Sequence, residues 1–222
     1  MITGRNMGRG DAIVARIGAA GGEGHFHAAD LRSATEITTL VASTVERFGQ
    51  LDLAFNNAGV FDRSQSFSTY TDDAWDEMIA VNLTAVFRCM RAEICSMLES
   101  GGGVIVNNAS TVGHRGSERA SAGYVAAKHG VIGLTRQAAL EHVDSGIRVN
   151  AVSPGPTQTA LSAPLEAQGL EAVRRALMSL NPTGRFVSTQ EVAHAVVFLC
   201  SDAASMINGH DVPLDGGQLA KL

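Results

Sequence analysis

The sequence predicts an α/β protein with a doubly wound parallel sheet and helices on both faces. Strand-like and helix-like segments alternate along the 222 residues. Several of the strands are continuous apolar runs, which is typical of parallel strands covered on both faces. The length suits a single domain over residues 1–222, because a chain of this size buries one sizeable core.

The expected elements follow in chain order. A glycine-rich turn over 3–10 leads into a helix over 11–20, a strand over 24–29 and a helix over 35–48. Then come a strand opening 51–59, a long helix over 72–98, a strand over 102–110, a helix over 123–143 and a strand over 147–155. Helices over 170–180 and 189–201 precede a last strand within 209–217. Pro213 cannot donate to a ladder, so this last strand is expected at a sheet edge.

Composition excludes several classes of function. The net charge is −5 and no run of Lys or Arg occurs, so neither nucleic acid nor an anionic membrane is an expected partner. No stretch is long and apolar enough to span a bilayer, and the first residues lack the apolar region of a secretory signal. The three cysteines and seven histidines have no metal-binding spacing, so no metal is expected. A cytoplasmic protein with reduced thiols is the expectation.

Tyr124 and Lys128 are the first candidates for chemistry. Four positions apart on a predicted helix, they share one face. A phenol titrates near 10, so it serves as an acid–base group at neutral pH only if its anion is stabilised. An ammonium one turn away could supply that stabilisation, although a half-buried tyrosine beside a surface lysine gives the same pattern.

Polar residues at predicted strand ends form the second group of candidates. Ser110 ends one apolar strand, and the segments Asn56–Gly59 and Pro154–Thr159 follow two others. In a doubly wound sheet, ligands bind beyond the carboxyl ends of the strands. Asn82 interrupts the apolar stripe of the long helix and needs partners for its amide. Each feature alone is also compatible with ordinary turn or hydrogen-bond chemistry.

Together, these features resemble the short-chain dehydrogenase/reductase family. The segment TGRNMGRG (3–10) matches the family's TGxxxGxG turn, and Asn56–Gly59 matches its NNAG. Asn82, Ser110, YVAAK (124–128) and PGPTQT (154–159) align in the same order. The resemblance covers nearly the whole chain from Asp30 onward. It implies a Rossmann-like fold, with 1–60 as a shortened cofactor half and 61–222 as the catalytic and substrate half.

The resemblance also implies a mechanism for an NAD(P)-dependent oxidoreductase that interconverts a secondary alcohol and a ketone. Tyr124 would exchange the proton, Lys128 would lower the Tyr124 pKa and bind the nicotinamide ribose, and Ser110 would polarise the substrate oxygen. Asn82 would hold a proton-relay water, and His114 could line the substrate pocket. The implied cofactor residues are Thr3, Gly4, Gly8, Gly10, Asp30, Asn56, Ala58, Gly59, Tyr124, Lys128, Pro154, Gly155, Thr157 and Thr159.

The N-terminus departs from the family pattern. Only Met1 and Ile2 precede the glycine turn, and one βα unit is missing before Asn56. In one alignment the helix over 11–20 follows the glycine turn directly and Asp30 binds the adenosine ribose, 20 positions after Gly10. In the other, that helix is the family's second, the ribose reader is deleted and Asp30 contacts the adenine. In either case a strand returning from a short helix is expected to pair with the first strand.

The sequence does not decide between NAD and NADP, nor does it fix the oligomeric state. A carboxylate at Asp30 slightly favours NAD over NADP, whereas Arg5, Arg9 and Arg32 could bind a 2′-phosphate instead. The alternative function is a catalytically impaired family member with weak or no dinucleotide binding, which acts as an oligomerising or binding protein. The family resemblance implies a homodimer or homotetramer formed through the helices over 72–98 and 124–141, and a small alcohol or ketone as substrate.

Overall fold

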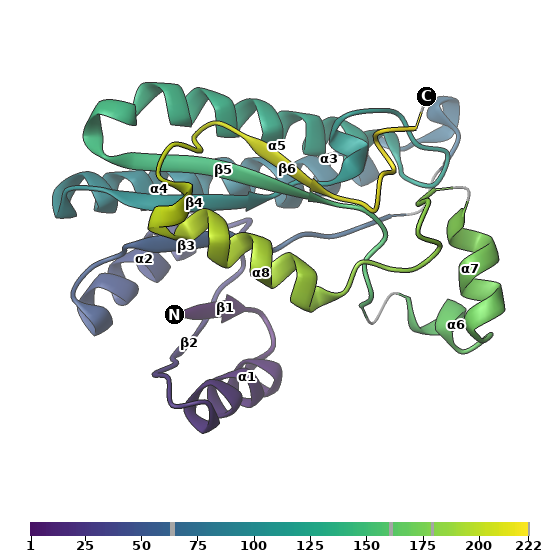
Figure 1. Cartoon of the computed structure of the whole chain (residues 1–222). Helices are drawn as coiled ribbons and strands as arrows, with labels where there is room; N and C mark the ends of the chain where they lie inside the picture. Colours follow the sequence, from purple (N-terminus) through teal and green to yellow (C-terminus); the bar gives the residue numbers. More distant parts are fainter. Residues whose placement is uncertain (63–64, 160–161, 179, 222) are drawn as a thin grey trace.

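The computed structural model describes residues 1–62, 65–159, 162–178 and 180–221, and its strands fall into two parallel sheets (Figure 1). The strands are β1 (Ile2–Gly4), β2 (Phe26–Ala28), β3 (Leu53–Asn56), β4 (Gly103–Asn108), β5 (Ile147–Pro154) and β6 (Asp211–Leu214). The larger sheet has the order β3-β4-β5-β6, and the smaller one pairs β1 with β2. The predicted parallel α/β architecture is confirmed, but its sheet is interrupted between β1 and β3.

The helices have nearly the predicted bounds. They are α1 (Met7–Ala19), α2 (Ala34–Phe48), α3 (Asp72–Ile79), α4 (Ala85–Ser100), α5 (Ala122–Glu141), α6 (Ala163–Glu166), α7 (Leu170–Met178) and α8 (Thr189–Cys200). Helix α1 begins four positions earlier than predicted, because the Asn6 side chain caps it by accepting a bond from the Arg9 amide at 2.9 Å. The predicted helix over 72–98 is continuous but contains one turn of π-helix at Ala80–Thr84.

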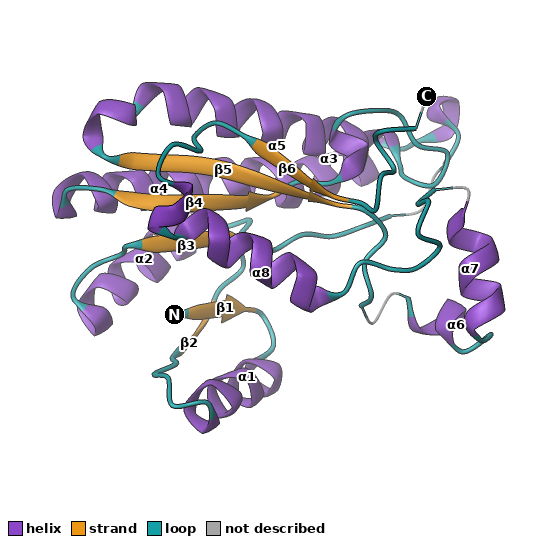
Figure 2. Ribbon diagram, viewed as in Figure 1, coloured by secondary structure: helices purple, strands orange, loops and turns teal. Residues whose placement is uncertain are grey.

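The larger sheet is a covered layer, as Figure 2 shows. Helices α4 and α5 pack on one face around Met97, Ile105, Val131 and Val149, and α8 packs on the other around Val106 and Leu199. Burial on both faces explains why β4 and β5 are continuous apolar runs rather than alternating ones. Pro213 lies in β6 at the edge of this sheet, as predicted.

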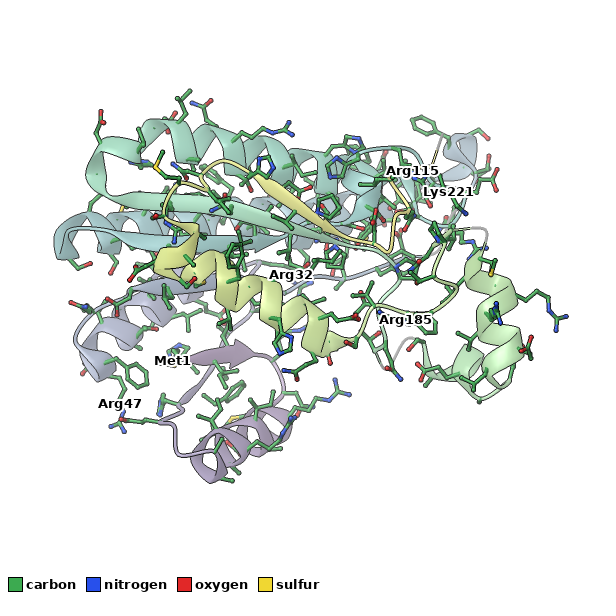
Figure 3. All side chains as sticks on the ribbon, in the orientation of Figure 1. Met1, Arg32, Arg47, Arg115, Arg185 and Lys221 are labelled. Atoms are coloured by element: carbon green, nitrogen blue, oxygen red, sulfur yellow. The ribbon has the colours of Figure 1, made fainter. Side chains whose placement is uncertain are left out.

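The smaller sheet carries the glycine turn. Ile2, Thr3 and Gly4 pair in parallel with Phe26, His27 and Ala28, so the chain returns through α1 to the neighbour of its first strand, as expected. The N-terminal unit β1-α1-β2 lies at one side of the larger sheet, below β3 in Figure 1. Met1, labelled in Figure 3, stands at the start of this unit.

No helix in the described part of the chain is long and apolar enough to cross a membrane.

Candidate active site

Tyr124 and Lys128 lie together in the first turns of α5. The Ser121 hydroxyl caps this helix by accepting a bond from the Tyr124 amide at 3.2 Å, which fixes the start of the helix at the phenol. The Lys128 ammonium lies 5.6 Å from the centroid of the Tyr124 ring and donates to the Asn108 carbonyl at 2.6 Å. Lys128 is 4% exposed, so this lysine is a buried partner of the tyrosine and not a surface residue.

Ser110 meets Tyr124 from the end of β4. Its hydroxyl lies near the Tyr124 phenol, whose pKa it lowers, and accepts from the Val112 amide at 3.4 Å. The loop that holds Ser110 packs tightly on α5 at Gly113, where a Cβ would approach the Lys128 carbonyl to 2.9 Å. The strand end and the helix therefore bring the two hydroxyls and the ammonium into one site, as the sequence predicts.

Burial controls the protonation of this site. It raises the pKa of Tyr124, and the hydrogen bond from Ser110 opposes that rise. Burial also lowers the pKa of Lys128 to about 8. We expected Lys128 to lower the Tyr124 pKa, but in this structure the removal of the phenol from water outweighs other effects. Tyr124 is therefore protonated at neutral pH, which suits proton donation.

Asn82 is fully buried in the π-helical turn. Its Oδ1 accepts from the Val60 amide at 3.0 Å, and its Nδ2 donates to the Met78 carbonyl at 3.1 Å. A Cβ on Gly59 would come within 2.8 Å of this Oδ1, so glycine is required at that close approach. The side-chain amide of Asn82 thus holds the loop after β3, which leaves its main chain as the group that could bind a water.

Four asparagines connect the ends of β3 and β4. The Asn56 amide donates to Glu93 and to the Asn107 oxygen, both at 3.0 Å, and the Asn108 amide donates to Asn57 at 2.9 Å. The Asn108 Oδ1 is buried and has no partner among the described residues. An acceptor left without a donor at a strand end beside Lys128 is a candidate contact for a bound molecule.

The predicted segment Pro154–Thr159 leaves the end of β5 beside the site. The Thr157 hydroxyl donates to the Gly155 carbonyl at 2.9 Å, and the Thr159 amide donates to the Ser162 hydroxyl at 3.0 Å. Gly155 lies against the C-terminal loop, where a Cβ would be 3.2 Å from the Cα of Asp215.

The glycine turn has the strand–turn–helix form expected of a phosphate site. Gly4 ends β1, Gly8 lies in the first turn of α1, and Gly10 is buried against Phe26 of β2. Thr3 bonds through its hydroxyl to the His27 carbonyl at 2.9 Å, which ties the turn to β2.

Replacing Gly10 with alanine is expected to destabilise the N-terminal unit. A Cβ there would be 2.2 Å from the Phe26 ring, and such overpacking costs about 1–3 kcal/mol. Gly18→Ala in the same helix is the matched control, because its Cβ would have no neighbour within 4 Å and alanine favours helix by about 0.5–1 kcal/mol. Hydrogen exchange of α1 and β2 should be faster in the first variant and slower in the second. Equal behaviour of the two would contradict the close packing of Gly10.

Asp30 is paired with Arg32. The guanidinium bonds both carboxylate oxygens, with Nη2 at 2.5 Å from Oδ2 and Nε at 3.1 Å from Oδ1, and it lowers the pKa of Asp30 to about 2. Arg32 also reaches Glu77 at 3.4 Å. The carboxylate that would repel a 2′-phosphate therefore has its charge offset by a neighbour that would attract one.

His114 is held by the last strand. Its Nε2 bonds the Asp211 carboxylate, whose other oxygen is 2.9 Å from the Ser153 hydroxyl. Ser153 is in turn 3.1 Å from the Ser110 carbonyl. Through these contacts His114 links β6 to the loop of Ser110.

Several residues near the site were not identified from sequence. Phe61 packs edge-on against the Tyr124 ring, with centroids 5.1 Å apart. Asp62 and Tyr70 both bond Ser121, the cap of α5. Glu93 is buried beneath Asn56, and burial raises its pKa to about 7. An acid placed directly between Ala92 and Ile94 in a helix was the available signal for Glu93. Nothing in the sequence pairs Asp62 with Ser121, 59 positions away.

Known proteins resemble this chain in sequence. A family model described as enoyl-(acyl carrier protein) reductase matches residues 1–218. Cyclohexanol dehydrogenase of Acinetobacter sp. (strain SE19) is 41% identical over 216 residues, which are 97% of this chain and 83% of that protein. The chain belongs to the short-chain dehydrogenase/reductase family, a family of oxidoreductases. A second relative, levodione reductase of Leifsonia aquatica, is 38% identical over 196 residues, which are 86% of this chain and 73% of that protein.

Solved structures of the family agree in fold. The crystal structure of levodione reductase superposes with a TM-score of 0.90 at 34% identity, covering 99% of this chain and 87% of that one. The crystal structure of a point variant of actinorhodin polyketide ketoreductase with NADPH gives a TM-score of 0.90 at 35% identity, covering 97% and 85%.

Two features of this short-chain dehydrogenase are compatible with a nicotinamide dinucleotide. The unpartnered Asn108 Oδ1 lies on the residue whose carbonyl binds Lys128, next to the paired hydroxyls. At the other end, Gly10 gives α1 the close helix–strand packing that dinucleotide folds require of their third glycine. These two features lie on different sheets: the glycine turn belongs to the smaller sheet, and the candidate catalytic residues lie on the larger one.

Proposed function

We propose that this protein is an NAD(P)-dependent dehydrogenase/reductase that interconverts a secondary alcohol and a ketone. The observation that carries the proposal is the gathering of the Ser110 hydroxyl, the Tyr124 phenol whose pKa it lowers, and the buried Lys128 ammonium 5.6 Å from the Tyr124 ring centroid. Two hydroxyls directed at one point form a small electrophilic site for a carbonyl oxygen.

The residues of the chain have distinct roles in this proposal. Ser110 donates a hydrogen bond to the substrate oxygen and holds it against the Tyr124 phenol. Tyr124, protonated because its burial raises the phenol pKa, donates the proton during ketone reduction. In alcohol oxidation the same group must be deprotonated first, so oxidation is favoured by higher pH. Lys128 stabilises the tyrosinate electrostatically, and the main chain of Asn82 holds the water that returns the proton.

The cofactor would be held by both halves of the chain. Lys128 and the segments Asn56–Gly59 and Pro154–Thr159 would hold the nicotinamide end, and Thr3, Gly4, Gly8 and Gly10 the pyrophosphate. Asp30 would lie near the adenosine. When bound, the nicotinamide supplies the hydride that no side chain can supply. Arg32 offsets the charge of Asp30, which removes the reason for the slight preference for NAD inferred from sequence. Binding should therefore be measured with both NADH and NADPH.

The names of the relatives narrow the substrate class that we propose. Cyclohexanol dehydrogenase and levodione reductase are named for a cyclic alcohol and a cyclic dione. A small cyclic secondary alcohol or ketone is therefore the first substrate class to try with this chain.

Dinucleotide binding tests the proposal most directly. We expect a saturable change in NADH or NADPH fluorescence at concentrations between about 1 μM and 1 mM, the usual range for such complexes. No change with either cofactor would reject the enzyme and favour the alternative, an oligomerising protein that has lost its cofactor. Binding without turnover of any cyclic ketone would leave the cofactor site supported and the proposed substrate class rejected.

The proposed assembly uses the exposed sides of α4 and α5. Phe87, Leu98 and Leu140 are among the exposed large apolar residues on these two helices. Exposed apolar side chains along two neighbouring helices support a homodimer or homotetramer formed there.

A further inference from the structure

The turn after β4 that carries Ser110 runs to His114 and contains a short 3₁₀ helix over Thr111–Gly113. We call residues 110–114 the Ser110 turn. The Gly113 amide donates to the Ser110 carbonyl at 2.8 Å, and a Cβ on Gly113 would approach the Lys128 carbonyl to 2.9 Å. Helix α5 therefore supports the middle of the turn, and other contacts must hold its two ends.

One carboxylate of β6 reaches both ends of the Ser110 turn. At the far end, Asp211 Oδ2 bonds Nε2 of His114. At the near end, Asp211 Oδ1 lies 2.9 Å from the Ser153 hydroxyl, which lies 3.1 Å from the Ser110 carbonyl. A hydroxyl has one hydrogen, so Ser153 shares it between these two acceptors in a three-centre bond. The contacts attach the turn to β6 at two points.

The carboxylate and its hydroxyl partner are withdrawn from water. The Asp211 side chain is 3% exposed and Ser153 is fully buried, whereas the His114 side chain is 28% exposed. A carboxylate in such a place needs partners, because an unpaired buried charge is strongly destabilising. Hydrogen bonds to a charged acceptor are also stronger than those between neutral groups. Asp211 therefore holds its two partners more firmly than a neutral side chain in its place would.

Strand β6 is itself fixed to the larger sheet. The Ala151 amide of β5 donates at 2.8 Å to the carbonyl of His210, the residue before Asp211. Ser153 lies two positions farther along β5, the strand between β4 and β6. The carboxylate thus stands on a paired strand and links that strand to the loop at the end of β4.

We propose that Asp211 is a positioning residue for Ser110 and that it acts through Ser153 and His114. The proposal rests on the proposed alcohol–ketone chemistry, in which the Ser110 hydroxyl holds the substrate oxygen against Tyr124. Asp211 touches neither substrate nor cofactor in this scheme. It keeps the hydroxyl in place, and a small displacement of such a group costs a large factor in rate.

Kinetics in two backgrounds test the role of Asp211. Asp211→Ala should lower kcat for cyclohexanone reduction by about 10–100-fold and change the cofactor Kd by less than about two-fold. In a Ser110→Ala background the same substitution should change kcat by less than about two-fold, because no hydroxyl is left to position. An equal loss in both backgrounds would show a general structural effect and would overturn the proposal.

A conservative variant and a surface variant give the controls. Asp211→Asn keeps an oxygen that accepts from Ser153 and an amide that can donate to a neutral His114 ring, so kcat should stay within about five-fold. Asp202→Ala removes an exposed acid from the segment that leads to β6 and should leave kcat unchanged. A loss in Asp211→Asn as large as in Asp211→Ala would contradict positioning by hydrogen bonds.

Hydrogen exchange tests the same contacts without turnover. The Gly113 amide should exchange faster in Asp211→Ala than in the unaltered protein, whereas exchange in α2 should not change. Unchanged exchange at Gly113 would overturn the proposal. Failure of the unaltered protein to reduce any cyclic ketone would instead reject the proposed function, and exchange alone would then decide on Asp211. If Asp211→Ala does not fold, His114→Ala removes one attachment at a partly exposed position, and its effect on kcat should likewise vanish in the Ser110→Ala background.

Discussion

Replacing Tyr124 with phenylalanine is expected to lower kcat by about 10²–10⁴-fold, the usual contribution of a general acid or base. The Kd for NADH or NADPH should change by less than about three-fold, because the lost hydroxyl lies near Ser110 and is the group proposed to contact the substrate oxygen. The ring, with its contacts to Phe61 and Lys128, stays in place. Steady-state kinetics with cyclohexanone and fluorescence titration of the cofactor measure the two effects separately.

Tyr70→Phe is the matched control, since the chain has only 2 tyrosines. Tyr70 bonds Asp62 and Ser121 rather than Ser110, at 2.8 and 3.1 Å. Its loss should lower the stability of the α5 cap by about 1 kcal/mol and leave turnover per folded molecule within a few-fold. Retained turnover in Tyr124→Phe, or an equal loss in both variants, would show that the proton donor is assigned to the wrong residue.

Replacing Glu93 with glutamine is expected to stabilise the protein by about 3 kcal/mol at pH 7.5. Burial raises the pKa of this carboxyl from 4.5 to about 7, so the folded protein holds the proton more tightly than the unfolded chain does. The stabilisation that comes from this tighter proton binding is fully present below pH 4.5. It is lost as the pH rises to about 7. Glutamine cannot ionise and still offers Asn56 an acceptor, so the variant avoids this loss.

Urea unfolding between pH 4.5 and 7.5 measures the difference. The two proteins should be nearly equal at the acid end and diverge as the pH rises. Glu99→Gln, on the exposed part of the same helix, should show no such divergence. A constant difference between the Glu93 variant and the original protein at every pH would contradict a buried, protonated Glu93.

The sequence was sufficient to locate candidate site residues wherever their placement depends only on nearby residues of the same helix or strand. The spacing of Tyr124 and Lys128 places both on one helical face, because an α-helix repeats every 3.6 residues. Ser110 and the asparagines at 56–57 were located from apolar runs that end in polar residues, because parallel strands end at one edge of the sheet. Even the edge position of β6 followed from Pro213, whose missing amide cannot serve a central strand.

Long-range packing decided the features that the sequence left open. The pKa of Tyr124 was expected to fall through Lys128 and instead rises, because the ring is buried by long-range packing that includes its contact with Phe61. The ion pair of Asp30 with Arg32 offsets the carboxylate charge that was expected to disfavour a 2′-phosphate. The bond of His114 to Asp211 depends on a strand 97 positions away in the sequence.

The sequence by itself determined the fold class and the order of the elements, because both follow from short-range periodicity and from the ends of apolar runs. The family resemblance singled out Asn82, Ser110, Tyr124 and Lys128 as catalytic candidates, and their catalytic roles stay a prediction. It also indicated that the N-terminal region is short of one βα unit. Only the tertiary structure decided where that shortage falls: between β1 and β3, where two strand edges face a cavity that contains Glu93. The physical reason is that each edge of β1 can pair with one neighbouring strand. The short connection through α1 places β2 on one edge of β1, so only the other edge is left to face the cavity.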